Sequence, residues 1–329
     1  QTVDIPRNKL KHNTPPEKNI ISIYFFICNR GTVILYFSCI IKRIMIYYLI
    51  IMMQSERGVI MTSLKDAKCI VIKVGTSTLT YDTGKTNIRR MAKLASVLSD
   101  LQNAGRQIVL VSSGAIGVGV GKLGLAEKPA DTPGRQAAAC VGQCELMYTY
   151  DKLFAEYSHN VAQILLTADD IQDARRSSHV HDTLERLLSW NALPIINEND
   201  AVATDEIGIQ TTIGENDTLS AIVARLVKAD ILVLLSDIDG LYTADPHKDP
   251  NAVLIPVVSE ITPEVLALAG GTGSSLGSGG MATKLKAATI ATTAGIDMII
   301  ANGENPEILY DLFDGKPVGT RFAGRGCCV

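Results

Sequence analysis

Two lysines in unusual settings are the residues of this chain most suited to chemistry. Lys73 interrupts the apolar run Cys69–Val74, which is typical of a buried strand and which is followed by Gly75-Thr76-Ser77. Lys284 follows the glycine-rich run Gly270–Gly280, where an alanine-rich helical pattern begins. Such a loop presents backbone N–H groups to an anion at a helix N-terminus, and a lysine adds a full positive charge. We therefore predict a phosphate-bearing ligand such as a nucleoside triphosphate; a flexible loop and ordinary surface lysines are the alternative.

Further polar residues stand where predicted strands end or predicted helices begin. Ser113 follows the run Gln107–Val111, and Asn197–Asp200 closes the run that starts at Leu193. Asn216-Asp217 opens a helical pattern. Ligands of parallel α/β sheets bind at the carboxyl ends of strands, which favours a binding site. The structural alternatives are a capping serine, a turn and a first-turn acid.

Short Val/Ile-rich runs alternate with longer helical patterns from Lys68 onward, which predicts an α/β fold with a doubly wound, mainly parallel sheet sandwiched by helices. The runs show little period-two polarity, so we expect strands buried on both faces. The predicted strands are Cys69–Val74, Gln107–Val111, Val161–Leu166, Leu193–Ile196, Ile231–Leu235 and Asp297–Ala301. The predicted helices are Asn87–Asn103, Thr132–Tyr157, Ser178–Trp190, Asn216–Val227 and Thr283–Ala294.

The first 60 residues differ in kind from the rest of the 329-residue chain. They hold eight Lys/Arg and three Asp/Glu, whereas the remainder holds 23 and 31, a balance of −8. Their apolar runs are about ten residues long, against roughly 20 for a membrane-spanning helix. We therefore expect residues 1–60 to be a non-native or disordered extension with no membrane span, and residues 61–329 to form one domain. A membrane-associated or targeting extension is the alternative.

Composition argues against several classes of protein. The net charge is only −3, and no basic stripe interleaved with aromatic residues is present, so nucleic acid is not an expected partner. Seven cysteines without a framework spacing suit a reducing compartment. Five histidines show no metal-ligand spacing, so no protein-held metal is expected. The adjacent cysteines Cys327 and Cys328 are consistent either with metal binding or with two exposed side chains that have no function.

Six motifs carry a resemblance to a known family. In order, they are Lys73–Ser77, Ser112–Ile116, Ile196–Val202, Gly214–Asp217, Gly240–Pro246 and Gly279–Lys284. The set resembles the glutamate 5-kinases of the amino acid kinase superfamily, from about Leu64 to about Phe322. The last two motifs are shared across the superfamily, whereas Asn-Glu-Asn-Asp-Ala-Val and Gly-Glu-Asn-Asp are narrower. The resemblance implies the amino acid kinase fold in a single-domain form, without a C-terminal RNA-modification-type module.

The resemblance also implies roles for individual residues. Lys73 and Lys284 would stabilise the transferred phosphoryl group, and Asp217 would lie between them and orient them as a third catalytic residue. Ser113, Asp200 and Asn216 would bind substrate. The ATP-binding residues would be Lys73, Gly75, Thr76, Ser236, Asp237, Ser278, Gly279, Gly280, Met281, Ala282, Thr283 and Lys284.

By the same resemblance, the enzyme would phosphorylate the side-chain carboxylate of glutamate, the first step of proline biosynthesis. ATP would bring Mg²⁺ held mainly by its phosphates. Proline would inhibit through contacts near the loop Ala201–Gly214, an expected substrate lid that is a little longer here than in familiar relatives. A cytoplasmic homo-oligomer is expected.

Three alternatives remain open at this point. An acetylglutamate, carbamate or uridylate kinase shares the superfamily, and an inactive nucleotide-binding regulatory protein would keep the fold. A dehydrogenase would rest on Gly119–Gly124, which fits GxGxxG but does not follow directly on a strand.

Overall fold

The computed structural model describes residues 64–81, 83–202, 216–246, 248–269 and 280–324. The chain divides into two compact units, Gln1–Gly58 and Val59–Val329, and all described residues belong to the second. The predictions for the extension 1–60, for most of the lid Ala201–Gly214 and for Cys327-Cys328 lie outside the described residues.

The described residues form an eight-stranded sheet in the order β3-β4-β2-β1-β5-β7-β8-β6. All neighbouring strands are parallel except β7 and β8, which are antiparallel. The predicted doubly wound, mainly parallel α/β sheet is therefore confirmed. The strands are β1 (Cys69–Val74), β2 (Gln107–Ser112), β3 (Val161–Leu166), β4 (Leu193–Glu198), β5 (Ile231–Ser236), β6 (Val257–Val258), β7 (Asp297–Asn302) and β8 (Thr320–Phe322).

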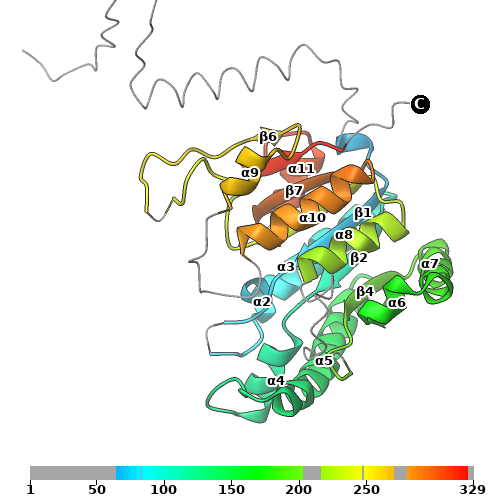
Figure 1. Cartoon of the computed structure of the whole chain (residues 1–329). Coiled ribbons are helices and arrows are strands. Elements are labelled where there is room, and N and C mark those ends of the chain that lie inside the picture. Colours follow the sequence, from blue (N-terminus) through cyan, green and yellow to red (C-terminus); the bar gives the residue numbers. More distant parts are fainter. Residues whose placement is uncertain (1–63, 82, 203–215, 247, 270–279, 325–329) are drawn as a thin grey trace, which may run out of the picture. The chain divides into compact units, whose positions relative to one another are not determined.

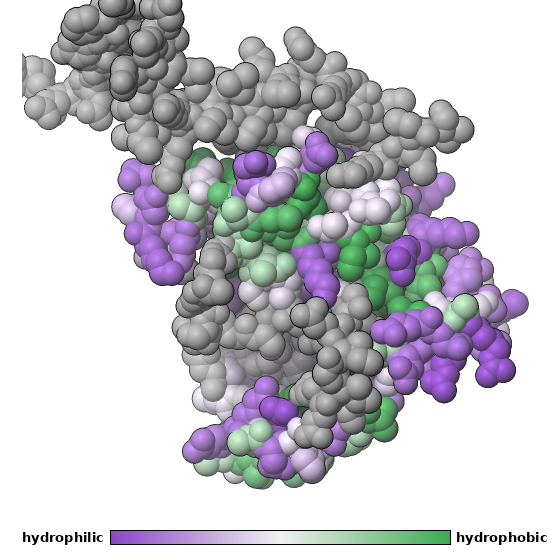
Figure 2. Space-filling model, viewed as in Figure 1, coloured by the Kyte–Doolittle hydropathy of each residue, from purple (hydrophilic) through white to green (hydrophobic). Residues whose placement is uncertain are grey.

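Helices cover both faces of the sheet. Figure 1 shows α8 and α10 in front of the central strands, and α3 and α11 behind them. The helices are α2 (Thr76–Leu79), α3 (Ile88–Asn103), α4 (Ala115–Leu123), α5 (Thr132–Ala155), α6 (Ala168–Gln172), α7 (Ala174–Ser189), α8 (Asn216–Leu226), α9 (Pro263–Ala267), α10 (Met281–Thr293) and α11 (Ile308–Phe313), with a 3₁₀ turn at Leu64–Asp66. Hydrophilic side chains gather over α7 (Figure 2), in which Leu184 is the buried residue.

The central strand β1 decides on which face Lys73 lies. Successive side chains of a strand point to opposite faces. Ile70, Ile72 and Val74 belong to the core beneath α3 and α11, whereas Val71 belongs to the core beneath α8 and α10. By this alternation Lys73 projects toward α8 and α10, at the carboxyl end of the strand.

The edge strand β3 differs from the prediction of strands buried on both faces. It pairs with β4 alone, and its side chains are partly exposed up to Leu166, with Gln163 exposed. The apolar run Val161–Leu166 does not distinguish an edge strand from a central one, because the pattern carries no information about how many neighbours a strand has.

The Gly119–Gly124 motif is part of a helix–helix contact. Gly119 and Gly121 lie inside α4, so the motif is not the loop between strand and helix that a dinucleotide fingerprint requires. A Cβ on Gly119 would lie 1.8 Å from the carbonyl oxygen of Ala138, and one on Gly142 would lie 1.8 Å from that of Ala115. The glycines thus let the backbones of α4 and α5 approach closely. Because Gly119–Gly124 is not a nucleotide-binding loop, no motif remains to support the dehydrogenase alternative.

We expect Gly142→Ala to destabilise the protein by about 1–3 kcal/mol, because the added methyl group overpacks the α4–α5 contact. On an exposed helix the same change would stabilise by up to about 1 kcal/mol, so the sign is diagnostic. Thermal unfolding measures it. Ala137→Ser, at an exposed position of the same helix, is the matched control. A melting temperature equal to or above that of the wild type would contradict the contact.

Candidate active site

Two lysines and one aspartate converge at the carboxyl end of β1. Lys73 Nζ lies 2.6 Å from Asp217 Oδ1, and Lys284 Nζ lies 3.3 Å from Asp217 Oδ2. The three residues are 9%, 4% and 1% exposed, for Lys73, Lys284 and Asp217. Two positive charges share one carboxylate, so the buried cluster keeps a net positive charge. Such a cluster is suited to an anionic ligand.

Three elements that are distant in sequence position this cluster. Lys73 is held by the pairing of β1 with β2 and β5, and Asp217 and Lys284 belong to the first turns of α8 and α10. Thr283 Oγ1 also donates to Asp217 Oδ2 at 3.1 Å. The carboxylate is therefore fixed from α10 as well as from the strand.

Competing effects act on the pKa of Asp217. Burial by itself raises the pKa, while the charges of Lys73 and Lys284 and the hydrogen bonds from Lys73 and Thr283 lower it. The lysines and hydrogen bonds prevail, and the pKa lies below its ordinary value. Asp217 is thus an anion at neutral pH and a poor acceptor of protons.

Helix N-termini surround the same end of the sheet. Gly75 is the N-cap of α2, and a Cβ there would lie 3.8 Å from Lys73 Nζ. Gly114, with φ of +95°, is the N-cap of α4, and a Cβ there would lie 3.4 Å from Thr76 Cγ2. Gly280 is the N-cap of α10, and Met281 and Ala282 begin that helix. The first N–H groups of a helix have no partner within that helix, so these ends favour an anion near the lysines.

A second cluster is built from amide side chains. Asn216 Nδ2 donates to Ser113 Oγ at 2.8 Å and to Asn197 Oδ1 at 3.0 Å. Asn197 Nδ2 in turn donates to Gln143 Oε1 at 3.0 Å. Ser113 and Asn216, both predicted from the sequence, are therefore brought together directly, next to the Lys73–Asp217–Lys284 cluster along α8.

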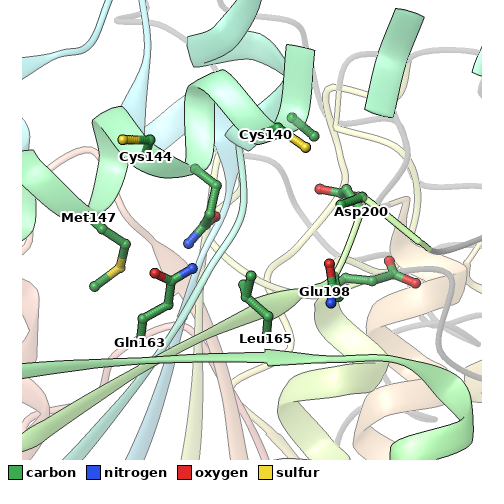
Figure 3. A pocket seen from close by; sticks show the side chains of 11 residues that line it. Cys140, Cys144, Met147, Gln163, Leu165, Glu198 and Asp200 are labelled. Carbon is green, nitrogen blue, oxygen red and sulfur yellow. The ribbon is translucent and has the colours of Figure 1, made fainter. Parts of the chain in front are cut away.

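Asp200 lines a cavity of about 380 Å³ between α5 and the ends of β3 and β4. Figure 3 shows Asp200 and Glu198 on one side of this cavity and Cys140 and Cys144 of α5 on another. Gln143 of the amide cluster lines the same cavity. Asp200 and Gln143, the residue of the amide cluster that contacts Asn197, thus line one cavity.

The remaining predicted residues lie at the end of β5 or outside the described chain. Ser236 Oγ donates to Asp237 Oδ1 at 2.9 Å, and β5 is the direct neighbour of β1. Ser278 and Gly279 lie outside the described residues. The three cysteines in the described ranges, Cys69, Cys140 and Cys144, are free.

The family to which this chain belongs follows from its match to a family model. The model of the amino acid kinase family matches residues 68–302. The chain belongs to the amino acid kinase family. A glutamate 5-kinase of Clostridium perfringens is 55% identical over 263 residues, which cover 80% of the chain and 98% of the Clostridium protein. A glutamate 5-kinase of Listeria welshimeri is 54% identical over 263 residues, covering 80% of the chain and 95% of that protein. The resemblance to glutamate 5-kinases is thereby confirmed.

Two solved structures of other kinases share the fold. The isopentenyl phosphate kinase of T. acidophilum, in a product complex, has a TM-score of 0.54 at 19% identity and covers 78% of the chain and 100% of its own. A carbamate kinase from Giardia lamblia bound to AMP-PNP has a TM-score of 0.53 at 18% identity, covering 79% and 100%. At these identities the likeness shows the fold alone.

Two properties of this amino acid kinase bear on metals and membranes. Within the described ranges, no group of three or more His, Cys, Asp or Glu side chains is placed to hold a metal ion. None of the helices described here combines the length and the apolar character that a bilayer-spanning helix needs.

Gln143 is the site residue that sequence reasoning missed. It follows the small residues Ala137–Gly142 on the long helix α5, and a lone glutamine in such a stretch carries no signal of its own. The neighbouring Asn197 was already part of the predicted polar run after β4. Only the packing of α5 against the end of β4 brings the two amides together.

Proposed function

We propose that this amino acid kinase transfers the γ-phosphoryl group of ATP to the side-chain carboxylate of L-glutamate and forms L-glutamyl 5-phosphate, the first step of proline biosynthesis. The observation that carries the proposal is the convergence of Lys73 and Lys284 on the buried Asp217 at the carboxyl end of β1. The glutamate 5-kinases that match nearly along their whole length support glutamate as the acceptor.

The state of Asp217 fits a carboxylate acceptor. A hydroxyl acceptor has to lose a proton as the phosphoryl group arrives, and a base must take it. The carboxylate of glutamate, with an ordinary pKa of about 4.3, is already ionised at neutral pH and needs no base. Asp217, held by two lysines with a lowered pKa, then acts by orienting Lys73 and Lys284.

The lysines stabilise the charge that moves during transfer. Negative charge spreads over the oxygens of the transferred group and onto the leaving phosphate in the transition state. In our proposal Lys73 contacts the transferred group and Lys284 contacts the β- and γ-phosphates. Fixed positive charges in a water-poor site stabilise such a state without reorganisation.

The nucleotide would lie over the ends of β1 and β5. We assign its phosphates to the helix N-termini at Gly75-Thr76 and at Ser278–Thr283, and its adenosine to Ser236 and Asp237. Mg²⁺ would arrive with ATP and be held mainly by phosphates and water, because Asp217, the carboxylate of the cluster, is already occupied by two ammonium groups.

Glutamate would lie over the ends of β2 and β4. We assign its ammonium group to Asp200 and to the amide oxygen of Asn216, and its α-carboxylate to the Ser113 region, because Asn216 Nδ2 already donates to Ser113 and Asn197. Proline would compete through overlapping contacts near residues 201–214.

We also propose that the protein is a cytoplasmic homo-oligomer. The free thiols of Cys140 and Cys144 are compatible with a reducing compartment.

A coupled assay of ADP release with a panel of acceptors tests the proposal. We expect turnover with glutamate and none with acetylglutamate, because acetylation removes the positive charge that Asp200 recognises. Asp200→Ala should raise KM for glutamate roughly 10- to 100-fold, the cost of a lost hydrogen bond to a charged group, and leave KM for ATP near that of the wild type.

Asp182→Ala, at an exposed position of α7, is the matched control for loss of an acidic side chain. Faster turnover of acetylglutamate, carbamate or uridylate than of glutamate would refute the substrate and keep the phosphoryl-transfer chemistry. An Asp200→Ala variant with an unchanged KM for glutamate would refute the role of Asp200.

A further inference from the structure

Gln143 stands at one end of a chain of amide hydrogen bonds that reaches the proposed substrate site. The chain runs from α5 through Asn197 on β4 to Asn216 on α8, with contacts of 3.0 Å each. It ends at Ser113 Oγ, which accepts from Asn216 Nδ2 at 2.8 Å. Asn197, the middle member, is 2% exposed. A buried amide of this kind adopts the orientation that its hydrogen-bond partners allow.

The orientation of each amide depends on the one before it. Gln143 presents its oxygen to Asn197, so the NH₂ group of Asn197 must face α5 and its oxygen must face Asn216. The backbone N–H of Glu198 also donates to that oxygen, at 2.9 Å. With Asn197 turned over, its NH₂ group would meet the NH₂ group of Asn216, and two donors would oppose each other.

The last amide of the chain then presents an acceptor. Because Asn216 Nδ2 is engaged by Ser113 and Asn197, Asn216 Oδ1 points elsewhere. This oxygen is buried, and among the described residues it has no hydrogen-bond partner. A buried acceptor without a partner costs free energy unless a ligand supplies a donor. An ammonium group is such a donor.

We propose that Gln143 is a positioning residue, which acts through Asn197 to hold Asn216 with its oxygen toward the ammonium group of the amino-acid substrate. The inference rests on the proposed function, because it takes the substrate to be a free amino acid. Gln143 itself would touch neither substrate nor phosphate. Its effect is therefore on substrate affinity, and the phosphoryl-transfer step is left unchanged.

Two substitutions at Gln143 separate positioning from packing. Gln143→Met keeps the length of the side chain and removes the acceptor, so the NH₂ group of Asn197 loses its hydrogen bond to α5. Gln143→Glu keeps an acceptor toward Asn197 Nδ2 and cannot present a donor there. Met147→Leu is the matched control, because Met147 lines the same cavity without belonging to the amide chain.

We expect Gln143→Met to raise KM for glutamate about tenfold, the usual cost of one lost buried hydrogen bond. KM for ATP and kcat should stay within about twofold of the wild type. Gln143→Glu should remain within about threefold of the wild type in KM for glutamate, and Met147→Leu should change nothing. In an Asn197→Ala background, Gln143→Met should have no further effect, since the chain is already broken.

Several outcomes would overturn the inference. An unchanged KM for glutamate in Gln143→Met, or equal loss in Gln143→Glu and Gln143→Met, would refute positioning through the acceptor. Additive losses with Asn197→Ala would do the same. If the wild type itself does not turn over glutamate, the proposed function fails; if the wild type is active and Gln143→Met matches it, the inference alone fails.

Discussion

Lys73→Ala is expected to lower kcat on the order of 10²-fold or more, the usual cost of removing one electrostatic donor to a transition state. The reason is that Lys73 projects from the strand at the point where the phosphoryl group would be transferred, 2.6 Å from its carboxylate partner. Lys284→Ala should have a loss of the same order. Steady-state turnover with glutamate and ATP measures both, and KM should change far less than kcat.

Lys316→Ala provides the control for loss of a lysine, because its side chain is 62% exposed and pairs with Asp311 on α11. This variant should retain wild-type turnover. Circular dichroism should show that the Lys73 and Lys284 variants remain folded. Near wild-type kcat in either catalytic variant would show that its assigned role is wrong.

Asp217→Asn is expected to lower both stability and kcat, since it removes the carboxylate that Lys73 and Lys284 share. Breaking a buried ion pair by removing one partner typically costs about 3–5 kcal/mol. ATP should stabilise the variant by a larger shift in melting temperature than it gives the wild type, because the phosphates supply the missing negative charge. Thermal unfolding with and without ATP measures this difference.

The pH dependence of unfolding gives a second test of Asp217. Its pKa is lowered in the folded protein, so the folded state holds this proton less tightly than the unfolded state. The resulting stability is fully present above the unfolded pKa, near 4, and is lost as the pH falls through the folded pKa. Asp217→Asn should lack this component of acid unfolding. An identical loss of stability below about pH 4 in both proteins would contradict the ion cluster.

The sequence allowed the sheet and the positive charges of the site to be predicted. A lysine in an otherwise apolar strand has few structural explanations, and strands of β-branched residues between helical patterns indicate a parallel sheet. All six predicted strands begin and end within two residues of the observed ones, and all except Val161–Leu166 are buried as expected. The family resemblance, and not the residue pattern, singled out Asp217 as the partner of the two lysines.

What the sequence did not reveal depends on packing between distant segments. The exposure of β3 follows from its place at the edge of the sheet, and an apolar run does not encode strand order. The contribution of Gln143 follows from the contact between α5 and the end of β4. The glycines of α4 resembled a nucleotide motif and instead allow two helices to approach closely, which a one-dimensional spacing does not distinguish.

The position of β1 in the sheet has a consequence for how the protein folds. Its two neighbours are β2, which follows at Gln107, and β5, which begins only at Ile231. During synthesis, one edge of this buried strand therefore stays unpaired until more than half of the chain has been made. Non-local pairing of this kind slows folding and exposes a strand edge to other chains. The strand that carries Lys73 is thus also a part of the nascent chain that needs protection from aggregation.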